Sequence, residues 1–241
     1  MTIYEISYKV LRIMLSAFDN RITRDIKTIT KTNNIKSIVD VGGRKSPYTI
    51  GFSGKVTIID KPPKNEIQKT LNLGIDYEKK IEINKNRSNI KNIILHDITE
   101  KNINVSEKFD LALFIEVIEH IEEDEKALSN IHNLLSNEGI LYLTTPNGDY
   151  IPSDNNPDHV KHYTRDELKL LLSKYFKNVK IEYAIRTGKF RLRSLNAYKI
   201  KHPLKLVITI INGFINKIQS IGVKNQYLRT AHLIAICSRK K

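Results

Sequence analysis

Short apolar runs alternate with amphipathic stretches along most of the chain. The apolar runs read as strands, and the stretches between them place apolar side chains three and four residues apart, as helices do. This alternation predicts an α/β fold with a mainly parallel sheet. The expected strands are 37–41, 55–60, 92–96, 109–115, 139–145, 179–185 and 231–237.

An amphipathic stretch over residues 3–29 leads the chain, with Phe18, Ile22, Ile26 and Ile29 at helical spacing. We expect one or two helices there, packed on the core, with a lid over an active site as the alternative. We therefore assign residues 1–30 to an N-terminal helical cap. Residues 31–241 form the main domain.

Three further helices are expected within the main domain. One covers roughly 121–136 and stops at Asn137-Glu138-Gly139, and another covers the charged segment 76–87. A third begins at Thr164, whose hydroxyl forms a capping box with Glu167.

Composition and charge narrow the class of protein. A chain of 241 residues with 40% hydrophobic content can bury one large core, and its single cysteine, Cys237, excludes an internal disulfide. No apolar run is long enough to cross a membrane, so we expect a cytoplasmic protein. The basic excess is local, because residues 186–241 hold 13 Lys and Arg and no Asp or Glu. This region should attract an anionic surface.

The predicted strands end in polar residues. In open α/β sheets, ligands bind beyond the carboxyl ends of the strands. The first strand runs into Gly42-Gly43, where the absence of Cβ atoms would let a ligand approach the backbone. A helix entered around Ser46-Pro47 would offer free N–H groups to a carboxylate. Asp60 lies 18 residues after Gly42, near the offset of an acid that takes ribose hydroxyls.

The stretch from Phe109 to Ile121 makes the pattern specific, because it ends in Glu116-Val117-Ile118-Glu119-His120-Ile121. With Thr144-Thr145-Pro146-Asn147 and the run from His162 to Leu168, it resembles the class I S-adenosylmethionine-dependent methyltransferases, in particular their small-molecule branch. The resemblance covers about residues 36–185 and the last strand. It implies a Rossmann-like, seven-stranded, mostly parallel sheet with helices on both faces and an antiparallel last strand at the sheet edge, supplied by residues 231–237.

The resemblance also implies a binding site for S-adenosylmethionine and its product, S-adenosylhomocysteine. Gly42, Gly43 and Asp40 would lie beneath the methionine portion, and Asp60 would bind the ribose. Asp97 and the backbone of Ile98 would read the adenine, and Glu116 would lie beside the sulfonium. The family usually has Gly-x-Gly-x-Gly after the first strand, whereas this chain has Arg44 and Ser46 in place of the second and third glycines. Either Arg44 or Lys45 touches the cofactor carboxylate, or binding is weak.

Methyl transfer to a hydroxyl group needs a base as well as alignment, and histidine suits that task near neutral pH. His162 and His159 lie in a polar loop after the fifth strand, and His120 belongs to the Glu-His motif. These three are the candidate bases. Solvent-exposed histidines are the alternative for the two loop positions, and a structural or cofactor-side role is the alternative for His120. No metal site is expected from their spacing.

Residues 186–229 read as a basic amphipathic insertion before the last strand. Val207, Ile211, Phe214, Ile218 and Ile221 would share one helix face. Such a segment can lie on an anionic membrane, cover the site or form a dimer contact. Nucleic-acid binding is a weaker reading, because no recognised module accompanies the lysines.

We therefore predict a methyltransferase that acts, at oxygen, on a small molecule or a glycan, the latter lipid-linked at the inner membrane face. An RNA methyltransferase and a non-catalytic protein of the same fold are the alternatives.

Overall fold

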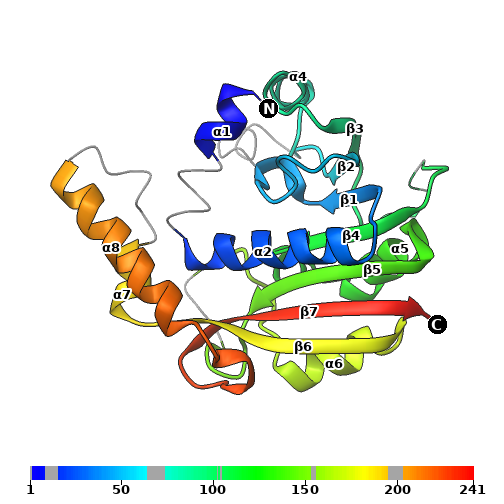
Figure 1. Ribbon diagram of the computed structural model, residues 1–241. Helices are drawn as coiled ribbons and strands as arrows, with labels where there is room; N and C mark the ends of the chain where they lie inside the picture. The colour runs from blue at the N-terminus through cyan, green and yellow to red at the C-terminus, as the bar shows by residue number, and fades with distance from the viewer. Residues whose placement is uncertain are drawn as a thin grey trace.

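A seven-stranded sheet forms the centre of the computed structural model, with strand order β3-β2-β1-β4-β5-β7-β6 (Figure 1). The structure describes residues 2–8, 16–63, 74–101, 103, 105–152, 156–194 and 203–241. The strands from β1 to β5 pair in parallel, and β7 is antiparallel to both of its neighbours. All seven predicted strands are present: β1 (Ser37–Val41), β2 (Lys55–Asp60), β3 (Ile90–Leu95), β4 (Phe109–Ile115), β5 (Leu135–Pro146), β6 (Phe176–Arg186) and β7 (Thr230–Lys240).

The position of β7 corrects one prediction. The last strand is antiparallel, as expected, but it lies between β5 and β6, so that β6 forms the edge. Leu233, Ala235 and Cys237 of β7 pack into the core on one face of the sheet, and Ala231 and Ile234 pack into the core on the other. A strand buried on both faces is best placed in the interior of a sheet, where both of its edges are also paired.

Helices cover both faces of the sheet (Figure 1). Successive strand residues point to opposite faces, so Ile38 of β1 packs with Ile22 and Ile26 of α2 (Ala17–Thr32) on one side. Val39 packs on the other side, with the core that α5 (Asp124–Leu134) and α6 (Arg165–Leu172) complete. The expectation that the leading amphipathic stretch packs on the core is thus confirmed for α2.

Two helix starts agree with the sequence prediction, and one helix end differs from it. The capping box of Thr164 and Glu167 is present at α6, and Asp76 caps α4 (Tyr77–Asn86). Helix α5 ends at Leu134, before the predicted stop, and Gly139 lies inside β5 instead. A Cβ at Gly139 would lie 2.9 Å from Leu135 Cβ, where the pairing with β4 shifts register. This glycine therefore serves an irregular strand pairing and not a helix end.

The remaining helices belong to the two ends of the chain. At the N-terminus, α1 (Ile3–Tyr8) carries the fully buried Glu5, which accepts a hydrogen bond from the Ser88 N–H at 2.9 Å. Near the C-terminus, the predicted insertion forms α7 (Lys189–Ser194), α8 (Pro203–Gln219) and a 3-10 turn, η5 (Val223–Asn225). Parts of the leading amphipathic stretch and of the predicted insertion lie outside the described residues, namely positions 11, 15 and 195–202. Among those described, no helix has the length and apolar character of a membrane span.

Candidate active site

A cavity of about 540 Å³ lies beyond the carboxyl ends of the parallel strands. Its size is in the range of small-molecule sites. Most residues that the sequence assigned to the cofactor line it, and they lie at the ends of β1, β2, β3 and β4 or in the loops that follow these strands. These are Gly42, Asp60, Asp97, Ile98 and Glu116, together with His120.

The turn after β1 needs its two glycines because of the chain itself. Gly42 has a left-handed φ of 74°, and a Cβ there would lie 2.6 Å from Val117 Cγ2. A Cβ on Gly43 would lie 2.4 Å from Asp40 Cγ. The sequence predicted glycine here so that a ligand could approach the backbone, and the structure adds that neighbouring side chains also exclude a Cβ.

The helix expected around Ser46-Pro47 is absent among the described residues. Instead Gly43–Lys45 form a single 3-10 turn, η2, and Ser46 ends it with its N–H donating to the Gly43 carbonyl at 3.0 Å. A proline at position 47 disfavours helical backbone in the residue before it, which explains the early stop. The N–H groups of a regular helix N-terminus are therefore not supplied by this segment.

Asp40 lies under the turn with 2% of its surface exposed. Burial raises the pKa of its carboxyl to about 6, helped by the nearby Asp60 and opposed by Ser46 and Arg87. The carboxyl group is thus poised to change its charge close to neutral pH.

Arg44 fills a role that the sequence left open. Its guanidinium Nη1 lies 3.2 Å from Asp60 Oδ2, so the residue that replaces a family glycine pairs with the acid expected to hold the ribose. Burial raises the pKa of Asp60, although the Arg44 charge opposes that shift. The sequence indicated that Arg44 was unusual but gave no sign of its partner.

Asp97 begins the turn after β3. Its Oδ1 accepts hydrogen bonds from the Thr99 N–H at 3.0 Å and the Thr99 hydroxyl at 2.8 Å. The Ile98 carbonyl accepts from Asn130 Nδ2 at 2.8 Å. These contacts fix the backbone that faces the cavity between β3 and α5.

Glu116 follows β4 in a left-handed conformation, with φ of 52°. Its carboxylate accepts from the Thr144 hydroxyl at 2.9 Å and lies 3.2 Å from His232 Nδ1. Burial alone would raise the pKa of Glu116, but His232, Thr144 and Arg191 together lower it. A strained backbone held by several partners is a common feature of functional sites.

His232 and Arg191 were not predicted as site residues. His232 stands in the otherwise apolar start of β7, and its ring stacks on Phe18 with centroids 4.1 Å apart. Arg191 Nη2, from α7, lies 2.9 Å from His232 Nε2. A lone histidine in a buried strand was the only signal in the sequence. The connection to Arg191 depends on how the insertion folds back.

The three predicted histidines come together beside the cavity, and only His120 lines it. His120 and His159 meet edge to face with centroids 4.8 Å apart. His120 Nδ1 lies 2.8 Å from the Asp158 carbonyl, which can only accept, so this nitrogen carries the proton and Nε2 is the basic atom.

The hydrogen bonds of His162 and His159 fix the protonated nitrogen of each of these rings as well. His162 Nδ1 donates to the Ile151 carbonyl at 2.6 Å, which leaves His162 Nε2 as an acceptor. His159 Nδ1 lies 3.0 Å from that atom and must donate to it. His162 therefore orients His159, whose Nε2 remains basic.

The fold also assembles a possible set of metal ligands that the sequence did not predict. Glu119, His120 and His159 each offer one ligand atom, and these atoms lie within 4.8 Å of one another. Imidazole and carboxylate are common ligands of divalent metals, so the cluster has the chemistry either to accept a proton or to hold a cation. Spacing along the chain hid this group, because the loop after β5 folds back against the Glu-His motif.

Comparisons with known proteins agree with the geometry. The sequence model of the family described as "Methyltransferase domain" matches residues 14–180. None of the curated proteins matches this chain in sequence. Among solved structures, a SAM-dependent methyltransferase from Archaeoglobus fulgidus is 19% identical, with a TM-score of 0.60 and full coverage of both chains.

Two other solved structures are similar over most of their length. The N-methyltransferase NodS from Bradyrhizobium japonicum, in complex with S-adenosylhomocysteine, is 13% identical, covers 91% of this chain and 86% of its own, and has a TM-score of 0.53. The plantazolicin methyltransferase BamL, in complex with a triazolic desmethylPZN analog and SAH, is 14% identical, covers 99% and 90%, and has a TM-score of 0.55. The chain therefore belongs to the methyltransferase-domain family, and it has the class I fold of S-adenosylmethionine-dependent enzymes.

Proposed function

We propose that this chain transfers the methyl group of S-adenosylmethionine to a hydroxyl group of a small molecule or glycan and releases S-adenosylhomocysteine. The observation that carries the proposal is the shared cavity, where the acids at three strand ends, Asp60, Asp97 and Glu116, lie with His120. Two of these acids suit hydrogen bonds to ribose and adenine. Glu116, whose pKa is lowered, supplies a negative charge suited to a sulfonium.

The cavity fits such a cofactor in its donor and acceptor chemistry. Asp60 is buried, so its carboxylate gains from a hydroxyl partner, and Asp40 beneath the turn can balance an ammonium group when it ionises. Bound there, S-adenosylmethionine would supply the methyl group. The residues of the chain bind it, align the acceptor and remove the acceptor's proton.

His120 is the base that the geometry favours. It is the one of the three histidines that lines the cavity, and its Nε2 carries the lone pair. His159 extends the same cluster, and His162 acts as a positioning residue through His159. When an acceptor hydroxyl takes the methyl group that bound S-adenosylmethionine would supply, the imidazole of His120 would accept the hydroxyl proton.

Binding and turnover test the two halves of this proposal separately. Calorimetry with S-adenosylhomocysteine should give saturable heat, and no heat at millimolar ligand would leave a non-catalytic protein. S-adenosylhomocysteine release should then be followed over a panel of hydroxylated small molecules and glycans. His120→Ala should slow release about 10²- to 10⁴-fold with unchanged S-adenosylhomocysteine binding.

A chelator distinguishes the two chemistries of the histidine cluster. If His120 acts as a base without a bound cation, EDTA leaves turnover unchanged. Loss of turnover in EDTA, restored by a divalent cation, would instead make Glu119, His120 and His159 cation ligands. Methylation of amines but not of alcohols would overturn the choice of oxygen.

We also infer that the acceptor is met at an anionic membrane surface, as a lipid-linked glycan would be. The uniformly basic stretch 186–241 supports this, since it holds no acidic residue to repel anionic lipids. RNA is the alternative anionic acceptor. The exposed side chains of the insertion favour the membrane, because many are aliphatic: Leu204, Val207, Ile208, Ile211, Ile218 and Ile221.

A further inference from the structure

Helix α8 packs with its polar side inward. Thr209, Asn212 and Asn216 are buried, with 4%, 6% and 2% of their surfaces exposed. Asn216 Nδ2 donates to the Arg186 carbonyl at 2.7 Å, which ties the helix to the end of β6. A helix on the surface of a water-soluble domain normally buries its apolar stripe, so this arrangement is reversed.

The predicted apolar stripe of α8 consequently faces outward. Phe214, Ile218 and Ile221, at the end of the helix and just beyond, are 62%, 53% and 77% exposed. The prediction that these positions share a helix face holds for the residues within α8. A contiguous apolar surface of this kind marks an interaction site.

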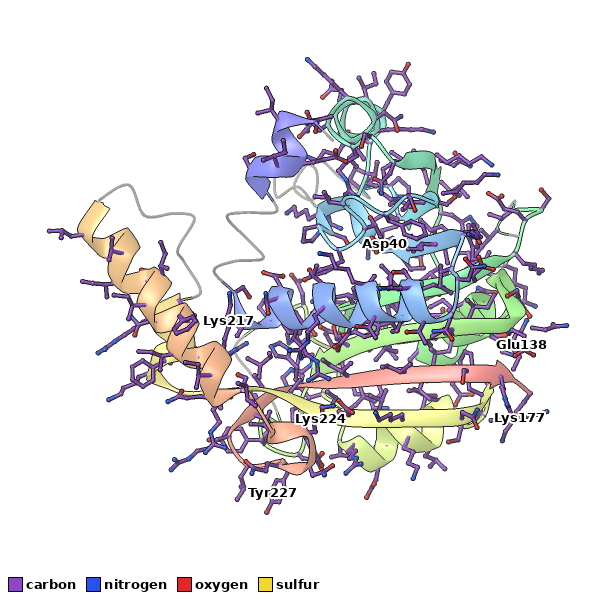
Figure 2. All side chains as sticks on the ribbon, viewed as in Figure 1. Asp40, Glu138, Lys177, Lys217, Lys224 and Tyr227 are labelled. Atoms are coloured by element: carbon purple, nitrogen blue, oxygen red, sulfur yellow. The ribbon has the colours of Figure 1, made fainter. Side chains whose placement is uncertain are left out.

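A groove of about 360 Å³ runs beside this stripe, between α8 and the start of α2. Phe214, Ile218 and Ile221 line it on the apolar side. Arg24 and Lys224 also line the groove. Figure 2 shows Lys217 on α8 and Lys224 in the turn after this helix, whereas Lys177 lies at the other end of the sheet.

Cations outnumber carboxylates around this groove. Arg21 binds Asp25 and Glu182, each at 2.7 Å. The side chain of Arg24 is 67% exposed, and its contact with Asp25 is long, at 4.0 Å. Lys224 lies 3.4 Å from Glu182, which also pairs with Arg21. The rim of the groove therefore presents excess positive charge beside an apolar face.

We propose that the outward face of α8 and the adjoining groove form a docking site for an anionic phospholipid bilayer. The apolar side chains enter the interface between headgroups and acyl chains, and Arg24 and Lys224 contact lipid phosphates at the rim. This inference rests on the membrane component of the proposed function and defines which surface meets the bilayer.

Charge decides between a bilayer and a second copy of the chain. Two copies meeting through this face would bring together two 186–241 stretches in which every Lys or Arg lacks a neighbouring Asp or Glu in the same stretch, because each has 13 basic and no acidic residues. Like charges in contact are destabilising, whereas anionic headgroups neutralise them. RNA would find few stacking rings on this face, since Phe214 is the aromatic residue among the apolar positions that line the groove.

Docking in this orientation would connect the membrane to the active site. Helices α7 and α8 are in contact, and Arg191 of α7 reaches His232, which lies beside Glu116. A lipid-linked acceptor held at the surface would therefore approach the site from the side of the insertion.

Vesicle flotation of the full chain tests the proposal. Binding to vesicles of phosphatidylglycerol and phosphatidylcholine should exceed binding to pure phosphatidylcholine at least tenfold. The double variants Ile218→Ser/Ile221→Ser and Arg24→Gln/Lys224→Gln should each weaken binding about tenfold or more. Leu170→Ser, at a 72% exposed position on α6, and Lys177→Gln are matched controls that should bind as the wild type does.

Several outcomes would overturn the docking site. The site would be wrong if both double variants bound vesicles as tightly as the wild type. It would also be wrong if the control variants lost as much vesicle binding as the double variants, or if binding did not depend on the charge of the lipid. A dimer that the Ile218→Ser/Ile221→Ser change dissociates, without vesicle binding, would assign the face to a second copy. Calorimetry with S-adenosylhomocysteine on the same samples separates this test from the methyltransferase proposal, because cofactor binding without vesicle binding removes the docking site and the membrane component and leaves the proposed methyl transfer standing.

Discussion

Arg44 places a positive charge in the loop that is expected to bind the cofactor. It stands where related loops have glycine, and it pairs with Asp60 at 3.2 Å inside the cavity. A ribose hydroxyl that takes Asp60 Oδ2 must displace this guanidinium or share the oxygen with it. The ion pair therefore competes with the proposed cofactor.

Arg44→Gln should strengthen S-adenosylhomocysteine binding roughly fivefold, because about 1 kcal/mol of charge-assisted hydrogen bonding no longer has to be exchanged. Titration calorimetry measures the change. Arg44→Lys, which keeps the charge, should bind nearly as the wild type does. Weaker binding by Arg44→Gln would show that the arginine itself contacts the ligand.

Asp40 predicts a pH dependence of stability in the ligand-free protein. Burial raises its pKa from 3.8 to about 6. Between these values the unfolded chain releases the proton and the folded chain keeps it, so the free energy of unfolding falls as pH rises. Above about pH 6 the loss levels off at roughly 3 kcal/mol.

Asp40→Asn should remove this dependence. Urea unfolding from pH 4.5 to 7.5 should show the variant gaining stability relative to the wild type as pH rises. Parallel pH profiles for the two proteins would mean that Asp40 titrates normally. The variant should bind S-adenosylhomocysteine more weakly, since Asp40 lies beneath the glycine turn.

At the scale of elements, α2 is attached to the sheet by an ionic network whose side chains are mostly but not fully buried. Arg21 binds Asp25 and Glu182, and the Tyr142 hydroxyl donates to Asp25 Oδ2 at 3.1 Å. Burial alone would raise the pKa of Glu182, but Lys180 and Arg21 hold it at about 2. The network connects α2 to β5 and β6.

Arg21→Met should lower the free energy of unfolding by roughly 3 kcal/mol, because it takes the cation that Asp25 and Glu182 share away from two mostly buried carboxylates. Chemical denaturation followed by circular dichroism gives the value. Arg24→Met is the matched control and should change stability by less than about 0.5 kcal/mol, since its side chain is 67% exposed. Equal effects would mean that the Arg21 pairs contribute little.

The insertion illustrates a second property of elements. Its helix was predicted correctly from periodicity, yet its apolar face points outward. Periodicity shows which residues share a face, but the neighbouring elements decide which face is covered. Here the polar Asn216 finds a backbone partner on β6, and that contact fixes the orientation.

For the whole molecule, charge is divided unevenly between the sheet domain and its last quarter. Residues 1–185 carry 27 basic and 26 acidic side chains, and residues 186–241 carry 13 basic side chains alone. An anionic polymer would be attracted by this asymmetry without being recognised. The alternative of an RNA methyltransferase can be tested on that basis.

Single-stranded RNA should bind weakly, because it would form only phosphate contacts with the basic residues. Binding of this kind is driven by the release of counterions, so the affinity should disappear between about 50 and 300 mM salt. Fluorescence polarisation over that salt range measures the effect. Affinity that persists at the upper salt concentration, and that depends on RNA sequence, would favour the RNA reading over the membrane.

Local sequence patterns were enough to predict the strands, most of the helices and the acids at the strand ends. These features depend on local periodicity, capping and the rule that ligands bind at the carboxyl ends of parallel strands. Gly42, Asp60, Asp97 and Glu116 could therefore be assigned to one site before their distances were known.

Other features depend on how the whole chain folds: the interior position of β7, the pairing of Arg44 with Asp60, and the contacts that join Glu116 to His232 and His232 to Arg191. The tertiary structure also gathered His120, His159 and His162 into one cluster and turned the apolar face of α8 outward. Each of these contacts joins residues from different elements. Their energies depend on burial and geometry that the whole chain creates, which local sequence patterns do not encode.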